Sequence, residues 1–246
     1  MDSNLRCSPI IFTTPRHKPD IRMFVFDQDF HVYSGLLKVH AAFFETMLEP
    51  SGGIIPTSTS PLFKSDWYTT LDKDLGWVLS SDPKCEHENL STFQGSISRE
   101  QQAFTNLLSA IFSKEYLLAN ASELEFMTKL ADYYRCLPIV SHSLSGTIYS
   151  SPDFFNSIRS DPCTLLISAF KLRHPLLFRE AFIMVLRPWS DPVYKQLEKN
   201  YPKLFNQADG AYKEVDAKIS KFHRHLFQIA ATDFPVVARS YTAVSW

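Results

Sequence analysis

The stretch that decides the fold runs from Ile21 to Tyr33 and reads IRMFVFDQDFHVY. It holds two short runs of branched and aromatic side chains, Arg22 to Phe26 and Phe30 to Tyr33, and such residues favour β-strands. A polar turn, Asp27 to Asp29, separates the two runs. The pattern therefore predicts a β-hairpin.

A helical pattern follows this hairpin directly. Ser34 belongs to the residue types that cap helix N-termini, and core-facing side chains then recur at intervals of three and four residues. These side chains are Leu36, Leu37, His40, Phe43, Phe44, Met47 and Leu48. The spacing predicts one helix, or two short ones, ending near Glu49.

A second hairpin is expected within residues 50–99, which otherwise read as polar loops. Its strands are the aromatic runs Phe63 to Leu71 and Trp77 to Ser81, joined by a turn that contains Asp and Gly. Trp67 and Trp77 on these strands allow two interpretations. They form part of a partner surface, or they fill a small core beneath the loop.

From Glu100 the pattern is helical almost to the end of the chain. Five side chains fall on one helical face, namely Phe104, Leu107, Leu108, Ile111 and Phe112. Ser122 followed by Glu125 has the form of a capping box, and Pro138 suits the first turn of the next helix. Further helices are predicted at residues 152–158, 162–172, 175–187 and 191–199.

The last long segment carries a heptad seam, in which apolar residues alternate at intervals of four and three. The seam consists of Ala208, Tyr212, Val215, Ile219, Phe222, Leu226 and Ile229. One interpretation is a partner-binding or dimerising helix. The other is a helix docked on its own domain, because about three heptads are short for an independent coiled coil.

The composition excludes several classes of function. Its 25 basic and 26 acidic side chains give a net charge of −1, which argues against a general nucleic-acid binder because phosphate affinity needs clustered Lys and Arg. Seven glycines leave little material for phosphate-binding loops. We expect no membrane span and no export signal. Four scattered cysteines favour a reducing intracellular compartment, either nucleus or cytoplasm.

The motifs that suggest chemistry are weak. The S-x-x-K match from Ser168 to Lys171 lies inside an apolar helical pattern, and the ligand-like residues Cys85 to Glu88 lack a second cluster at zinc spacing. His223 and His225 are two apart on a predicted helix and point to different faces. We therefore predict no catalytic residue, no metal site and no cofactor. An unrecognised hydrolase, whose catalytic pair meets only in the fold, stays open as an alternative.

Four blocks of the chain resemble the BTB/POZ domain. The first comprises Asp20, the predicted hairpin and the segment FHVYSGLLKVHAAFFETM at residues 30–47. The others are residues 103–112, residues 124–144, and residues 171–181 with Pro188 and Trp189, and they resemble a divergent group of the family that is common in fungi. Tyr33 and Ala41 depart from the family pattern, which has His and Ser there.

The resemblance implies an α+β fold, in which a small β-sheet is capped by a cluster of helices. The expected organisation is a flexible N-terminal arm at residues 1–19, a BTB/POZ-like domain at residues 20–150 with an insertion at about 50–99, and a helical extension at residues 151–246. The family's role implies a non-enzymatic module for protein–protein interaction and self-association as a homodimer. Many relatives link substrates to cullin-type ubiquitin ligases, so a substrate adaptor that binds a cullin through residues 104–112 is an alternative.

The candidate interface residues come from four parts of the chain. In many BTB/POZ relatives an arm strand pairs across the dimer by addition to a sheet edge, and the run at residues 10–14 can supply one or can belong to a disordered tail. The other candidates lie on the first helix, the aromatic hairpin and the later helices. The full set is Ile10, Ile11, Phe12, Leu36, Phe43, Phe104, Trp67, Trp77, Val215, Ile219, Phe222 and Leu226.

Overall fold

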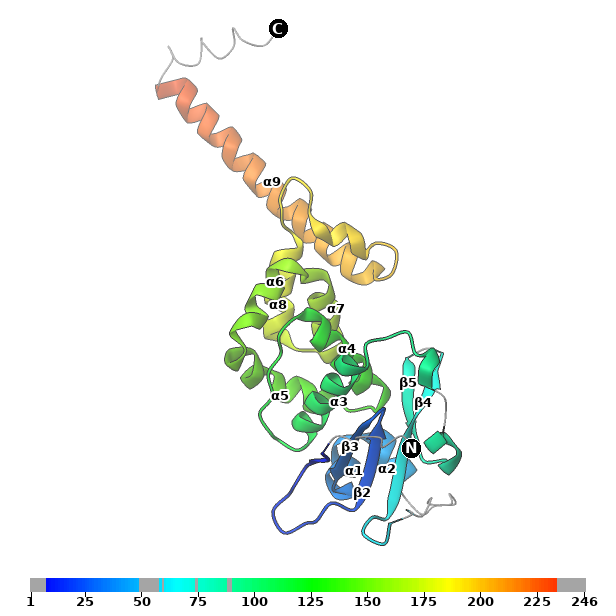
Figure 1. Cartoon of the computed structure of the whole chain (residues 1–246). Coiled ribbons are helices and arrows are strands. Elements are labelled where there is room, and N and C mark those ends of the chain that lie inside the picture. Colours follow the sequence, from blue (N-terminus) through cyan, green and yellow to red (C-terminus); the bar gives the residue numbers. More distant parts are fainter. Residues whose placement is uncertain (1–7, 49–57, 59, 74, 88–89, 234–246) are drawn as a thin grey trace. The chain divides into compact units, whose positions relative to one another are not determined.

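The computed structural model describes residues 8–48, 58, 60–73, 75–87 and 90–233. These residues form one five-stranded sheet and nine α-helices, which confirms the predicted α+β class (Figure 1). The chain divides into two compact units between Ala181 and Phe182. The first unit holds the sheet and most of the helices, and the second holds the long C-terminal helix.

The sheet combines the two predicted hairpins with a short edge strand. Its strands are β1 (Ile10–Ile11), β2 (Ile21–Val25), β3 (Gln28–Val32), β4 (Ser65–Asp72) and β5 (Gly76–Ser80). Their order is β1-β3-β2-β4-β5, with antiparallel pairing inside each hairpin and parallel pairing of β2 with β4 and of β1 with β3. Both hairpins are thus confirmed, although the first turns at residues 26–27 rather than 27–29.

The N-terminal strand differs from both predicted alternatives. Ile10 and Ile11 pair with Phe30 and His31 of the same chain rather than across a dimer. The next residue, Phe12, is only 3% exposed, and its ring lies 5.3 Å from that of Phe112. Burial of this ring holds residues 10–12 on their own sheet, because removing a phenyl group from water is favourable. Residues 1–7 of the predicted arm lie outside the described part of the chain.

Two short helices follow the first hairpin, α1 (Ser34–His40) and α2 (Ala42–Met47). Ala41 between them has an extended backbone, with φ −131° and ψ 101°, and therefore interrupts the helix. Of the two predicted alternatives, the pair of short helices is the one formed. The described part of this segment ends at residue 48.

The start of α1 is held by Asp20. The prediction that Ser34 caps this helix is wrong, because Ser34 is the first helical residue and Asp20 binds it. The Asp20 carboxylate accepts hydrogen bonds from the Ser34 amide and hydroxyl, each at 2.7 Å, and pairs with the Lys64 ammonium at 2.8 Å. Burial alone raises the pKa of Asp20. The Lys64 and Ser34 contacts outweigh burial, so the pKa lies below its ordinary value. One carboxylate thus links the segment before β2, the start of α1 and the approach to β4.

The remaining helices of the first unit begin near the predicted positions. They are α3 (Ile97–Ile111), α4 (Ala121–Tyr133), α5 (Leu137–Ser150), α6 (Pro152–Ser160), α7 (Pro162–Leu172) and α8 (Pro175–Val185), the last of which runs into the second unit; short 3-10 turns lie at η1 (Pro83–His87) and η2 (Leu90–Thr92). The predicted capping box of Ser122 and Glu125 is wrong. Instead, Asn120 accepts from the Glu123 amide at 3.1 Å, and the Glu123 carboxylate accepts from the Ala119 amide at 2.8 Å.

An aromatic cluster packs the sheet against the helices. Phe44 stacks on Tyr134 at 5.2 Å and meets Trp67 edge-on at 5.6 Å. Phe104 contacts Trp77 at 5.9 Å and Tyr134 at 6.2 Å. We call these five residues the aromatic cluster. Trp67, Trp77 and Phe104 are at most 3% exposed, so they fill the core of the first unit and do not lie on its surface. Of the two interpretations of Trp67 and Trp77, packing in a core is the one observed, although this is the main core rather than a small one beneath the loop.

Glu100 supplies a polar partner inside this core. Its carboxylate accepts a hydrogen bond from the Trp77 indole N–H at 3.0 Å. Burial raises the pKa of Glu100, while the Trp77 hydrogen bond and the charge of Lys129 oppose the shift only in part. The indole N–H, which would otherwise be costly to bury, is thereby satisfied.

The second unit is built around α9 (Pro202–Asp233). A short 3-10 turn, η3 (Val193–Leu197), replaces the helix predicted at residues 191–199. The Tyr212 hydroxyl donates to the Trp189 carbonyl at 2.7 Å, and the two rings stack at 4.3 Å. Ala208 is fully buried. The N-terminal part of the heptad seam therefore packs within its own chain.

We expect Asp20→Asn to lower the free energy of unfolding by about 1 to 3 kcal/mol, because asparagine keeps one acceptor oxygen but loses the charge and the second acceptor that bind the Ser34 hydroxyl and Lys64. Urea denaturation at neutral pH measures the change. Lys64→Met is the matched control: Lys64 is 72% exposed, so its loss is expected to change stability by less than about 1 kcal/mol.

The pH dependence of the Asp20 effect follows from the lowered pKa. The contribution of Asp20 is complete above its unfolded pKa and is lost as the pH falls below about 4 toward the folded value. The difference between wild type and Asp20→Asn therefore shrinks in acid. A difference that stays constant at strongly acidic pH would contradict this role.

Candidate functional site

The predicted interface residues of the first unit do not gather on one surface. Leu36 and Phe43 are half-buried, and the Phe43 ring packs at 5.3 Å from Tyr134 of the aromatic cluster. Ile10 is half-buried and Ile11 is 47% exposed at the sheet edge. Leu36, Phe43 and Ile10 are partly buried and Ile11 is a single exposed side chain, so none of them alone marks an interface.

The predicted residues of α9 do share one exposed face. Val215, Ile219, Phe222 and Leu226 lie along it together with Ile229. Their exposed fractions range from 37% for Val215 and Ile219 to 60% for Phe222. We call these five residues the α9 stripe. The docked-helix interpretation thus holds for Ala208 and Tyr212, while Val215 to Ile229 remain in contact with water.

Charged side chains flank the α9 stripe and keep this part of α9 compatible with water. Lys213 pairs with Asp209 at 2.7 Å and Lys218 pairs with Glu214 at 2.6 Å, each across one helical turn. The Lys218 contact lowers the pKa of Glu214 below its ordinary value. Such pairs support an exposed helix modestly. The helix therefore presents a narrow apolar band between solvated charges.

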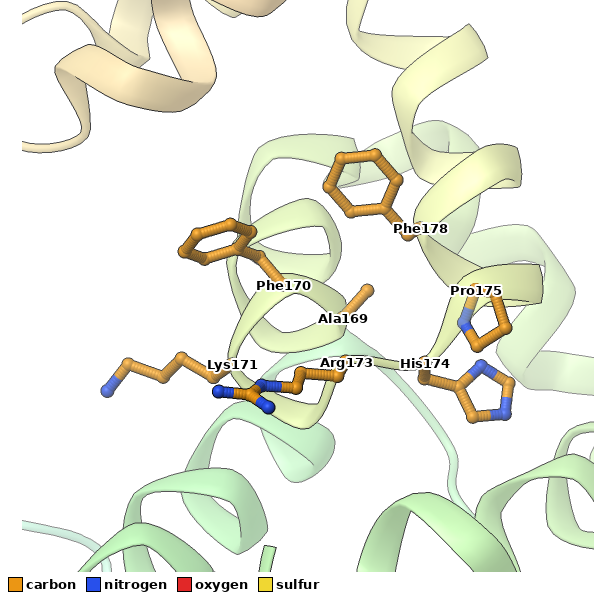
Figure 2. A pocket seen from close by; sticks show the side chains of 7 residues that line it. All are labelled: Ala169, Phe170, Lys171, Arg173, His174, Pro175 and Phe178. Carbon is orange, nitrogen blue, oxygen red and sulfur yellow. The ribbon is translucent and has the colours of Figure 1, made fainter. Parts of the chain in front are cut away.

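A pocket of about 490 Å³ lies at the junction of α7 and α8. Figure 2 shows Phe170 and Phe178 on one side of it, with Lys171 and Arg173 below Phe170 and His174 beside Pro175. The Lys171 ammonium is paired with Asp132 at 3.2 Å. The pocket thus combines two aromatic rings with the guanidinium of Arg173 and a buried histidine.

The histidine of this pocket meets a serine, which sequence reasoning missed. The Ser145 hydroxyl oxygen lies 3.0 Å from His174 Nε2. A Ser–His contact is the first requirement of a serine nucleophile activated by a general base. Ser145 lies on α5 and His174 lies 29 positions later, between α7 and α8, so no local motif could have found the pair.

The hydrogen bonding of His174 argues against a catalytic role. The Leu177 amide donates to His174 Nδ1 at 3.2 Å, so Nδ1 is an acceptor and the neutral ring must carry its proton on Nε2. Nε2 therefore donates to Ser145 and has no lone pair to take the serine proton. Burial lowers the pKa of His174, which favours this neutral form. His174 thus acts as the N-terminal cap of α8.

The other chemical motifs are placed in structural positions. Ser168 of the S-x-x-K match is 1% exposed on α7. Cys85 is half-buried in η1, and Glu88 lies outside the described residues. His223 and His225 are exposed on α9. Across the described residues, no group of three or more His, Cys, Asp or Glu side chains is placed to hold a metal ion.

Comparisons of the chain with protein-family models, with curated proteins and with solved structures find no match. Within the described ranges, no helix has both the length and the apolar character needed to cross a membrane.

The capping role of His174 predicts a specific pattern of stability changes. We expect His174→Ala to lower the free energy of unfolding by about 1 to 2 kcal/mol, because the cap is lost. His174→Asn keeps a side-chain oxygen that caps well, so its loss is expected to be smaller. Thermal denaturation compares the two variants, and equal losses would contradict the capping role.

The tautomer of His174 predicts that Ser145 is not an activated nucleophile. We expect a fluorophosphonate probe to leave Ser145 unlabelled, because Nε2 already holds the proton that a general base would have to accept. Mass spectrometry of the peptide that contains Ser145 gives the readout. A covalent adduct on Ser145 that is lost in His174→Ala would reverse the assignment.

Proposed function

We propose that this chain is a non-enzymatic protein-interaction module that associates with itself and with other proteins. The α9 stripe carries the proposal, because five large apolar side chains are held in one row in contact with water. Burial of apolar surface is favourable by about 25 cal/mol per Å². Contiguous exposed apolar surface of this kind is typical of a protein interface.

The spacing of the stripe favours another helix as the binding partner. Its residues alternate at intervals of four and three, which is the repeat that lets side chains of two helices interlock. The BTB/POZ resemblance supports the same proposal, because members of that family act as interaction and dimerisation modules. The net charge of −1 gives no support to nucleic-acid binding.

We do not extend the proposal to a cullin adaptor or to dimerisation through the N-terminal strand. The adaptor hypothesis relies on residues 104–112, of which Phe104 and Phe112 are both buried in this chain. The strand hypothesis requires an unpaired strand, whereas β1 pairs with β3 of its own chain. An intracellular location remains part of the proposal, supported by the free thiols of Cys85, Cys136 and Cys163.

The proposal predicts that the full chain forms dimers. Multi-angle light scattering over a range of concentrations is expected to give the mass of two chains at tens of micromolar, with dissociation on dilution. High salt is expected to leave the dimer in place, because apolar burial rather than charge supplies most of the free energy. The mass of a single chain at every concentration would contradict self-association.

A further inference from the structure

The charges beside the α9 stripe are unevenly distributed along the helix. Between residues 213 and 230 the acidic side chains are Glu214 and Asp216, both near the N-terminal end. The half that follows carries Lys221, Arg224 and two histidines without any acid. One half of the exposed segment is therefore close to neutral, and the other half is basic.

We infer that the α9 stripe pairs with the stripe of a second copy of this chain in antiparallel orientation. The inference rests on the proposed self-association and adds its location and direction. In the heptad, Ile219 and Leu226 occupy position a, while Val215, Phe222 and Ile229 occupy position d. In an antiparallel pair, an a residue of one helix faces a d residue of the other.

The antiparallel alignment matches the apolar residues of the α9 stripe and gives Asp216 a basic neighbour. Val215 faces Leu226 of the second copy, and Ile219 faces Phe222. The same alignment sets Asp216 beside His223 of the second copy at each end of the pair. The imidazole N–H then donates a hydrogen bond to the carboxylate. A positive charge on the histidine strengthens that hydrogen bond.

The antiparallel alignment also continues the packing already present in the second unit. It carries Ile229 of the second copy to Tyr212, whose ring stacks on Trp189 at 4.3 Å. The seam of α9 thus passes from a segment covered by its own chain to a segment covered by the second copy. The same apolar seam would then pack against its own chain at Tyr212 and against the second copy from Val215 onward.

A parallel pair of the same helices is disfavoured by charge. Lys218 lies beside a histidine of the second copy in either orientation, His223 in the parallel pair and His225 in the antiparallel pair, so this contact does not discriminate. The parallel pair, however, leaves Asp216 without a basic neighbour across the interface. It also brings the two basic halves together and aligns the two helix dipoles in the same direction. Like charges placed opposite each other discriminate between coiled-coil orientations.

Two phenylalanines of α9 allow a matched test of location. Phe222 lies in the α9 stripe, whereas Phe227 lies outside it and is 73% exposed. We expect Phe222→Ser to move the monomer–dimer midpoint at least about tenfold to higher concentration in the full chain. Phe227→Ser is expected to leave it unchanged. Both side chains are exposed in the single chain, so neither variant removes a core contact.

Disulfide formation between introduced cysteines tests the orientation. The background chain carries Cys7→Ser and Cys85→Ser, while Cys136 and Cys163 are buried. Val215→Cys and Leu226→Cys are prepared as separate proteins and then mixed. We expect disulfides between the two different variants and none within either variant alone.

The geometry explains this expectation. Identical positions in the antiparallel pair, such as residue 215 in both copies, lie about 16 Å apart along the axis at about 1.5 Å per residue. A disulfide needs Cα atoms within about 7 Å. In a parallel pair each variant would instead cross-link to itself.

Each outcome of these experiments decides one claim. A dimer that cross-links only in the mixture supports the inference. A dimer that cross-links within one variant, or that is unaffected by Phe222→Ser, overturns the inference but leaves self-association standing. A chain that stays monomeric, including one that instead binds vesicles of anionic lipid, overturns both.

Discussion

Burial of the aromatic cluster is the constraint on which the first unit depends. Phe44 comes from α2, Trp67 and Trp77 from the second hairpin, and Phe104 and Tyr134 from α3 and the end of α4. Four segments that are distant in sequence, namely α2, the second hairpin, α3 and the end of α4, are therefore held together by one set of ring contacts. Because such rings bury large apolar areas, their removal from water is a large favourable contribution to the stability of this unit.

Side chains of types that are often catalytic have structural roles in this chain: they hold the N-termini of helices or accept a hydrogen bond from a buried donor. Asp20 holds the start of α1, His174 caps α8, and Glu100 accepts the Trp77 indole proton. The aromatic cluster lies inside the core, whereas the α9 stripe is a row of exposed apolar side chains on one helix face. The proposed interaction module rests on this exposed helix face.

Local patterns predicted the elements well, and contacts between distant segments were the part they could not predict. The periodicity located α7 at residues 162–172, as observed. It could not show that Trp67 and Trp77 are buried, because aromatic residues favour strands whether their side chains face the core or the solvent. The heptad seam likewise continues through Ala208 and Val215, although the first is covered by its own chain and the second is exposed. What covers a side chain depends on the whole fold.

The central claim is that a second polypeptide covers the α9 stripe in solution. Hydrogen exchange of the backbone amides of residues 215–229, followed over a range of protein concentrations, tests it most directly, because exchange reports local opening. Protection of these amides is expected to increase with protein concentration, while that of α3 and α4 stays constant. Fast exchange of residues 215–229 that is independent of concentration would contradict it.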